Sequence, residues 1–269
     1  MPNEASQPVR PESAAQGPPS WTALIDDIVA GRWVDPQTGR AVRTPYETVV
    51  IADSLDGREA ELVVPLRLGA RLAVVSDENT RPAMGARIER ALAPIAAIDS
   101  VVLEHPHADE ATVGRLRELT RHADGVVAVG SGTINDLCKY MTATDGRAYC
   151  VFGTAPSMNG YTSTTASITL VSGLKVSRPA HAPKGVFIDL AVNAAAPPHL
   201  IAAGFGDCLC RSTAQVDWWL SKRLLDTFYS ESPFLVQRED EAKLMARAAA
   251  LPRRDVEAVG YLHRVLILC

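Results

Sequence analysis

Short β-branched apolar runs alternate with helical segments between Tyr46 and Val192, and this alternation limits the possible folds more than any other feature of the chain. Apolar runs of strand length separated by helices predict a parallel, doubly wound sheet that is buried on both faces. A hairpin turning at Ser172-Gly173 is expected within residues 166–179. The expected strands lie in the segments YETVVIADSL, ARLAVVSDENT, IDSVVLEHP, DGVVAV, RAYCVFGTAPS and GVFIDLAV.

The pattern changes near residue 195, where strand signals give way to helical ones. We therefore expect an α/β domain at residues 21–195 and an all-helical domain at residues 196–269, with a ligand cleft between them. Residues 1–20 are rich in Pro, Ser, Ala and Gln and lack the apolar core of a secretion signal. They predict a disordered tail.

Composition narrows the possible partners. The 269 residues carry a net charge of −4, whereas a nucleic-acid or anionic-membrane surface favours clustered Lys and Arg. No apolar run reaches the roughly 18 residues that a membrane span needs, so we expect a cytoplasmic protein whose partners are small molecules and other protein chains. The five cysteines fit reduced, mostly buried thiols, and Cys208-x-Cys210 lacks a second pair at zinc spacing.

Gly130-Ser131-Gly132 separates the strand-like GVVAV from the helical INDLCKYMTA. A glycine-rich turn between a strand and a helix lets backbone N–H groups approach phosphate oxygens. Asn135 replaces the third glycine of the dinucleotide-binding pattern, and Asp136 follows it. Two interpretations remain open, a phosphate cradle and a loop that uses glycine only for tightness.

A polar loop follows the next strand and contains Thr154, Ser157, Asn159, Thr162 and Ser163. Hydroxyl and amide groups at a strand end can bind a phosphate or a polyol. They can also satisfy the backbone of the turn. The number of such residues in one loop favours the ligand interpretation.

Asp207 stands in the largely apolar segment GFGDCLCR, where a carboxylate needs a cation or a strong donor. Arg211 follows one helical turn later, so a salt bridge between the two is the simpler expectation. Metal ligation by Asp207 is the alternative.

Three motifs together resemble the dehydroquinate synthase-like superfamily, which includes the iron-containing alcohol dehydrogenases, and within it the glycerol-1-phosphate dehydrogenases. The resemblance extends from about Trp21 to about Asp240. Its motifs are GSGTIND at 130–136, GTAPSMNGYTS at 153–163, and GD at 206–207 followed by DW at 217–218.

The resemblance implies a Rossmann-like fold that binds NAD or NADP. Asn159 stands where the family has an aspartate that contacts the substrate, a change that retains hydrogen bonding but removes a charge. The implied cofactor contacts are Gly130, Ser131 and Gly132 at the pyrophosphate with Asp136 nearby, Thr154, Ser157 and Ser163 at the nicotinamide side, and Asp77 at the adenosine ribose.

The family also holds a divalent metal, zinc or alternatively nickel or iron, through one aspartate and two histidines. Asp207 matches the aspartate and is the implied metal ligand, substrate contact and catalytic residue. The two histidines are expected well beyond Cys269, and His263 lies outside their motif, which predicts a core or interface histidine. We therefore expect a truncated or frameshifted chain with an incomplete helical domain that does not retain its metal.

The leading interpretation is an oxidoreductase that interconverts dihydroxyacetone phosphate and sn-glycerol 1-phosphate, impaired in this chain. A dehydroquinate synthase-like lyase and an inactive nucleotide-binding or dimerisation protein are the alternatives. The resemblance implies a homodimer. The choice between NAD and NADP, the identity of the metal and the direction of the reaction remain open.

Overall fold

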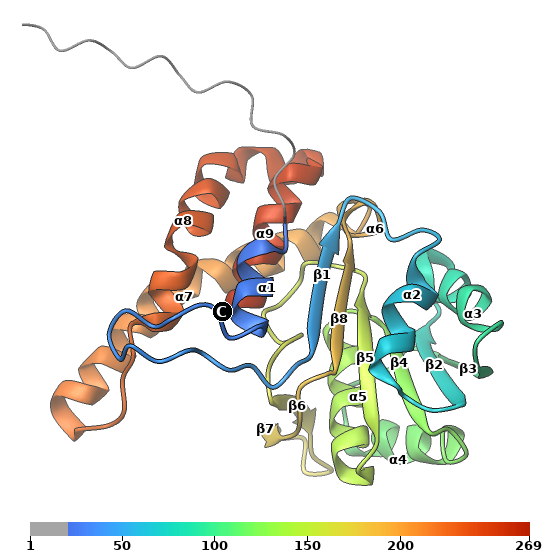
Figure 1. The fold of residues 1–269 in the computed structure, drawn as a ribbon. Helices are drawn as coiled ribbons and strands as arrows, with labels where there is room; N and C mark the ends of the chain where they lie inside the picture. The colour runs from blue at the N-terminus through green and yellow to red at the C-terminus, as the bar shows by residue number, and fades with distance from the viewer. Residues whose placement is uncertain (1–20) are drawn as a thin grey trace, which may run out of the picture.

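The computed structural model describes residues 21–269, and at its centre is a six-stranded sheet whose neighbouring strands are all parallel (Figure 1). The strand order is β1-β8-β5-β4-β2-β3. The predicted tail at residues 1–20 lies outside the described residues. The strands are β1 (Thr48–Ala52), β2 (Arg71–Asp77), β3 (Ala97–Leu103), β4 (Gly125–Gly130), β5 (Ala148–Gly153) and β8 (Gly185–Asp189).

Strand β4 shows how the sequence encodes this sheet. All six of its residues are buried. Val126 and Ala128 belong to one hydrophobic cluster, and Val127 and Val129 belong to the other. Successive side chains of a strand point to opposite faces, so a strand covered on both sides must be apolar at every position.

Helices cover both faces of the sheet (Figure 1). The sequence did not reveal α2, because five residues are too few to show helical periodicity. One face carries α2 (Glu59–Val63), a 3₁₀ turn (Val64–Leu66), a π-helical turn (Arg81–Gly85) and α3 (Ala86–Leu92), and the other carries α1 (Ala23–Val29), α4 (Glu110–Leu119) and α5 (Gly132–Asp145).

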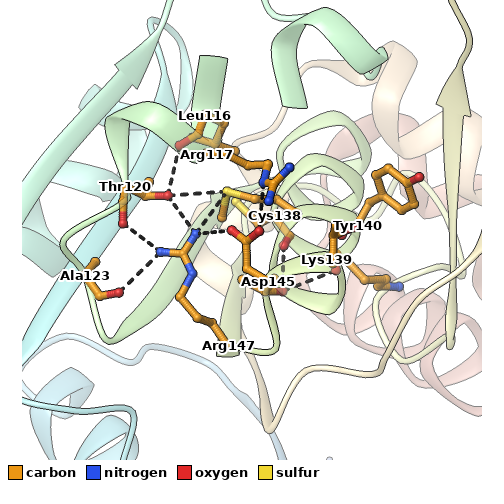
Figure 2. A network of polar contacts seen from close by, with 12 residues as sticks. Leu116, Arg117, Thr120, Ala123, Cys138, Lys139, Tyr140, Asp145 and Arg147 are labelled. Atoms are coloured by element: carbon orange, nitrogen blue, oxygen red, sulfur yellow. Dashed lines mark hydrogen bonds and ion pairs between the residues drawn. The ribbon is translucent and has the colours of Figure 1, made fainter. Parts of the chain in front are cut away.

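Arg147 anchors the C-terminal end of α5 to α4 (Figure 2). Its guanidinium donates to the carbonyl oxygens of Thr120 at 2.7 Å and Ala123 at 3.3 Å, and it pairs with Asp145 at 2.8 Å. Arg117 of α4 binds the other oxygen of Asp145 at 2.7 Å. Charge-assisted hydrogen bonds of this kind are the strong ones, so α5 is held firmly on the sheet.

The described chain is helical after β8. Helix α9 packs against α6, α7 and α8, and its buried residues share one hydrophobic cluster with the sheet. A parallel-sheet part followed by a helical part is therefore confirmed, whereas the domain limits 21–195 and 196–269 stay predictions. The elements are α6 (Leu190–Ala194), α7 (Pro198–Leu225), α8 (Ser232–Arg247), a 3₁₀ stretch (Ala248–Arg253) and α9 (Val256–Leu268).

A two-stranded antiparallel hairpin lies apart from the main sheet and consists of β6 (Thr165–Thr169) and β7 (Lys175–Pro179). Gly173 has a φ of +83° at its turn, a conformation that glycine adopts readily. The predicted hairpin is confirmed. Within residues 21–269, no helix combines the length and apolar character needed to cross a bilayer.

Candidate functional site

Strands β2 and β4 flank the point where the strand order reverses. The chain passes from β2 outward to β3 and then returns to the other side of β2 as β4. In open parallel sheets, ligands bind in the crevice at the carboxyl ends of such strands. Asp77 ends β2 and Gly130 ends β4, so two of the predicted site residues lie at this crevice.

A cavity of about 640 Å³, here called the switch-point cavity, opens at the crevice. Asp77, Thr80, Ser131, Thr154 and Leu200 are among the residues that line it, and no Lys or Arg of residues 21–269 does so. The Asp77 carboxylate accepts hydrogen bonds from the N–H groups of Asn79 at 2.9 Å and Thr80 at 2.7 Å. Asp77 therefore also shapes the turn that follows β2.

A second cavity of about 820 Å³, the loop cavity, adjoins the first through Ser131 and Leu200, which line both. Ten site residues were predicted from the sequence, and all except Gly130 line one or both cavities. Those at the loop cavity are Ser131, Gly132, Asp136, Ser157, Asn159, Ser163 and Asp207.

The two glycines of the turn differ in their surroundings. A Cβ at Gly130 would lie 2.6 Å from the Ile134 side chain, so this glycine is required by packing. A Cβ at Gly132 would have only the Met158 side chain nearby, at an ordinary 3.5 Å. Gly132 begins α5, and the preceding Ser131 makes no side-chain capping bond. The first turn of α5 thus faces the loop cavity with an uncapped helix end, the kind of helix end that can bind an anion.

Asp136 lies in the next turn of α5 and is half-buried at the edge of the loop cavity. Its carboxylate accepts hydrogen bonds from the N–H of Ser167 at 3.1 Å and from the Asn135 amide at 3.2 Å. Burial raises the pKa of Asp136, while the Ser167 N–H and the Lys139 charge oppose the rise. Asp136 thus ties α5 to strand β6 beside the cavity.

Asn159 and Asp207 meet across the loop cavity. One Asp207 carboxylate oxygen accepts the backbone N–H of Asn159 at 2.8 Å. The expected salt bridge between Asp207 and Arg211 is wrong, because Arg211 pairs with Glu241 of α8 instead. Helical spacing placed Arg211 within reach of Asp207, but tertiary packing supplied each residue with another partner.

Helix α7 approaches the polar loop unusually closely at Gly204. A Cβ at Gly204 would lie 1.7 Å from the carbonyl oxygen of Pro156. Only glycine permits this contact, which carries Asp207 to the loop one turn later. Local sequence patterns do not single out Gly204, because its neighbour Pro156 is 48 residues away in the chain.

Lys139 and Lys175 are two further residues near the loop that the sequence analysis missed. Lys175 lines the loop cavity from β7. Lys139 is 0% exposed and donates hydrogen bonds to the Ser163 hydroxyl at 2.8 Å and the Thr165 carbonyl at 3.3 Å. A lysine among the apolar residues of a helix, three positions after Asp136, was the available signal.

The residues present do not fit the metal that the resemblance implies. Zinc sites of enzymes use three protein ligands and keep one position open. Across residues 21–269, no three His, Cys, Asp or Glu side chains converge in a way that could hold a metal ion. Asp207 has no such partners among the described residues.

His263 lies in the core. This confirms the first of the two alternatives predicted for it, a core or an interface histidine. It is 0% exposed, and burial lowers its pKa to about 3. Its Nε2 lies 2.8 Å from the Asn193 Oδ1. The Asn193 amide donates to the carbonyls of Gly153 and Asp189, so Oδ1 is the acceptor and the His263 Nε2–H donates. Of the five free cysteines, Cys138, Cys150 and Cys208 are buried, as expected.

Comparison with known proteins identifies relatives of this fold and site. The family described as iron-containing alcohol dehydrogenase matches residues 50–197, more than half of the chain. The glycerol-1-phosphate dehydrogenase [NAD(P)+] of Bacillus velezensis is 37% identical over 202 residues, which cover 72% of this chain and 51% of the relative. The enzyme of the same name from Methanosphaerula palustris is 30% identical over 84% of this chain and 62% of its own length.

Solved structures share the fold. The glycerol dehydrogenase of Schizosaccharomyces pombe superposes with a TM-score of 0.67 at 19% identity, covering 82% of this chain and 60% of the other. An iron-containing alcohol dehydrogenase of Thermotoga maritima gives the same TM-score at 16% identity over 84% of this chain and 66% of its own. The chain spans about half the length of the curated relatives it matches.

Proposed function

The chain belongs to the iron-containing alcohol dehydrogenase family, and from this membership we propose that it binds NAD(P) across the two cavities as a glycerol-1-phosphate dehydrogenase-like oxidoreductase. When bound, NAD(P)H would supply a hydride to the carbonyl carbon of dihydroxyacetone phosphate, while a proton would join the carbonyl oxygen. The products are sn-glycerol 1-phosphate and NAD(P)⁺. Relatives with the printed name glycerol-1-phosphate dehydrogenase [NAD(P)+] support the proposal.

The observation that carries the cofactor proposal is the helix end at Gly132. Its Cβ direction is open toward the loop cavity, and the helix it begins has 14 residues. Backbone N–H groups at such an end bind phosphate oxygens without a side chain. The pyrophosphate is therefore assigned to Ser131 and Gly132.

The remaining contacts follow from the two cavities. Asp77 and Thr80 line the switch-point cavity, which accommodates the adenosine ribose. Thr154 lines the same cavity, and Ser157 and Ser163 line the loop cavity, where the nicotinamide would lie. Asn159 and Asp207 face the substrate. Within the described part of the chain no Lys or Arg lines the switch-point cavity, so we expect NADH to bind more tightly than NADPH, whose 2′-phosphate would lie near Asp77.

No reaction step is assigned to a metal ion, because the described residues do not provide its ligands. The shortage of metal ligands among the described residues favours a second function, a nucleotide-binding protein without dehydrogenase activity. The homodimer and the cytoplasmic location implied by the resemblance stay predictions.

Binding and turnover distinguish the two functions. NADH and NADPH are titrated against the purified chain by the fluorescence of the dihydronicotinamide, and dihydroxyacetone phosphate reduction is followed by the loss of that signal. Binding together with turnover supports the dehydrogenase, whereas binding without turnover supports the second function. If neither cofactor binds, the assignment of the two cavities is wrong.

A further inference from the structure

The middle of α5 carries a buried ammonium group that the proposed reaction does not use. Lys139 is 0% exposed, and its Nζ donates hydrogen bonds to the Gly160 carbonyl, the Ser163 hydroxyl and the Thr165 carbonyl. These three acceptors belong to one short stretch, residues 160–165. Figure 2 shows Lys139 directed away from the Arg147 network that anchors the same helix.

We propose that Lys139 is a positioning residue whose ammonium holds residues 157–165 in the conformation that binds cofactor and substrate. This inference rests on the proposed function for its consequence in binding, but the ordering of the loop is independent of it. Lys139 contacts neither cavity directly and acts through Ser163 and the backbone next to Asn159.

The polar atoms around Lys139 explain why the loop needs it. The Ser163 hydroxyl itself lies 3.0 Å from the Gly160 carbonyl and 2.9 Å from the Thr165 carbonyl. One hydroxyl hydrogen cannot satisfy both carbonyls, whereas an ammonium group provides three donors. Without Lys139, these oxygen atoms would lose a charged donor in a partly buried place, where the Asn135 amide, 3.4 Å from the Gly160 carbonyl, and the Ser163 hydroxyl are the other donors.

Burying the Lys139 ammonium without a salt bridge costs free energy, so filling space in the core does not explain why a lysine stands here. It forms no salt bridge of 4.0 Å or less in the described chain, and Asp136 on its own helix is the acidic group that acts on it. From other elements, His181 after β7 faces Lys139 itself, whereas Tyr149 of β5 and Lys175 of β7 face Asp136. Burial lowers the pKa of Lys139 to about 8. An apolar side chain of similar volume would serve packing as well or better.

The loop is held from two sides. Lys139 binds it from below at residues 160–165, and Asp207 of α7 accepts the Asn159 N–H. Asn159 is exposed and Gly160 and Ser163 are half-buried, so these positions depend on polar contacts, whereas Tyr161 between them is anchored in the core. Loss of the ammonium should therefore loosen residues 157–165 and leave the sheet intact.

The test compares Lys139→Met with the parent chain and with Lys184→Met. Lys184 also binds a carbonyl, that of Leu66 at 3.0 Å, but lies at the amino ends of the strands, away from both cavities. In Lys139→Met we expect amide hydrogen exchange in residues 157–165 to rise about tenfold or more and NADH affinity to fall about tenfold. The Tm should change little, because the loosening is confined to the loop, and Lys184→Met should change neither loop exchange nor NADH affinity.

A pH series separates positioning from packing. In the parent chain, loop exchange corrected for its intrinsic pH dependence should increase as Lys139 loses its proton above pH 8, and Lys139→Met should lack this step. Lys139→Arg should restore part of the protection. Unchanged loop exchange in Lys139→Met overturns the proposal. If that variant does not fold, absence of the pH step in the parent overturns it. If the parent fails to bind NADH but shows both exchange effects, the proposed function fails and the role of Lys139 stands.

Discussion

The edge of the sheet that carries the proposed cofactor site and the helical part after β8 are built in different ways. At this edge, residues 125–163 provide a strand, a glycine turn, a helix, a second strand and a polar loop in direct succession, and the proposed phosphate site consists largely of backbone N–H groups. In the helical part, Asp207 is a single carboxylate without further ligands among residues 21–269. A phosphate site made of backbone can be complete in one short stretch of chain, whereas a metal site needs several side chains from distant positions.

The two parts are nevertheless packed as one body. Gly204 of α7 touches Pro156 of the loop, and His263 of α9 binds Asn193, whose amide binds the end of β5. The helical part therefore supports the loop even where it supplies no metal ligands. The following predictions test how far the two parts differ and how closely they depend on one another.

Metal content should show the largest difference between the proposed phosphate site and the helical part. We expect the purified 269-residue chain to hold well under one zinc, nickel or iron per chain after equilibration with each ion, because one carboxylate competes poorly with water. Elemental analysis after dialysis is the measurement, with NADH titration on the same sample as the control for folding. A stoichiometric ion would remove the contrast between the two parts.

Gly204→Ala should disrupt the contact between α7 and the polar loop, which joins the helical part to the sheet edge. Its Cβ would overlap the Pro156 carbonyl oxygen, a backbone atom that cannot turn aside, so we expect a loss of about 3 kcal/mol in the free energy of unfolding. Gly206→Ala is the matched control, since it lies in the same helix with nothing within 4 Å of the added Cβ. This control should gain about 0.5–1 kcal/mol. Equal denaturant midpoints for the two variants would contradict the close approach.

Gly132→Val should sharpen the assignment of the phosphate site. Its Cβ meets only an ordinary contact with Met158, so the Tm should change little. The side chain would nevertheless cover the helix end, and we expect NADH affinity to fall about 100-fold, or about 2.7 kcal/mol. Gly130→Ala, which overlaps Ile134, should instead lower the Tm. Unaltered NADH binding in Gly132→Val would place the pyrophosphate elsewhere.

His263 should make the free energy of unfolding sensitive to acid. Its pKa is lowered by burial to about 3 in the folded chain and returns to about 6.5 on unfolding, so the unfolded state binds more protons in that range. Stability from this group is complete above about pH 6.5 and is lost as pH falls toward 3, by about 2 kcal/mol between pH 7 and pH 5. The difference in unfolding free energy between the parent and His263→Gln should shrink by that amount. A pH-independent difference would show that His263 does not titrate as described.

The sequence by itself determined the alternation of strands and helices, the turn at 130–132 and the polar loop, because each depends on neighbouring residues and short periodicities. It also placed nine of ten site residues around two adjoining cavities, since the carboxyl ends of parallel strands share one edge of the sheet. Only the tertiary structure decided that Asp207 binds Asn159 and not Arg211, that Gly204 seats α7, and that Lys139 holds the loop. These contacts join residues 21 to 48 positions apart, and their partners are chosen by packing that local spacing does not encode.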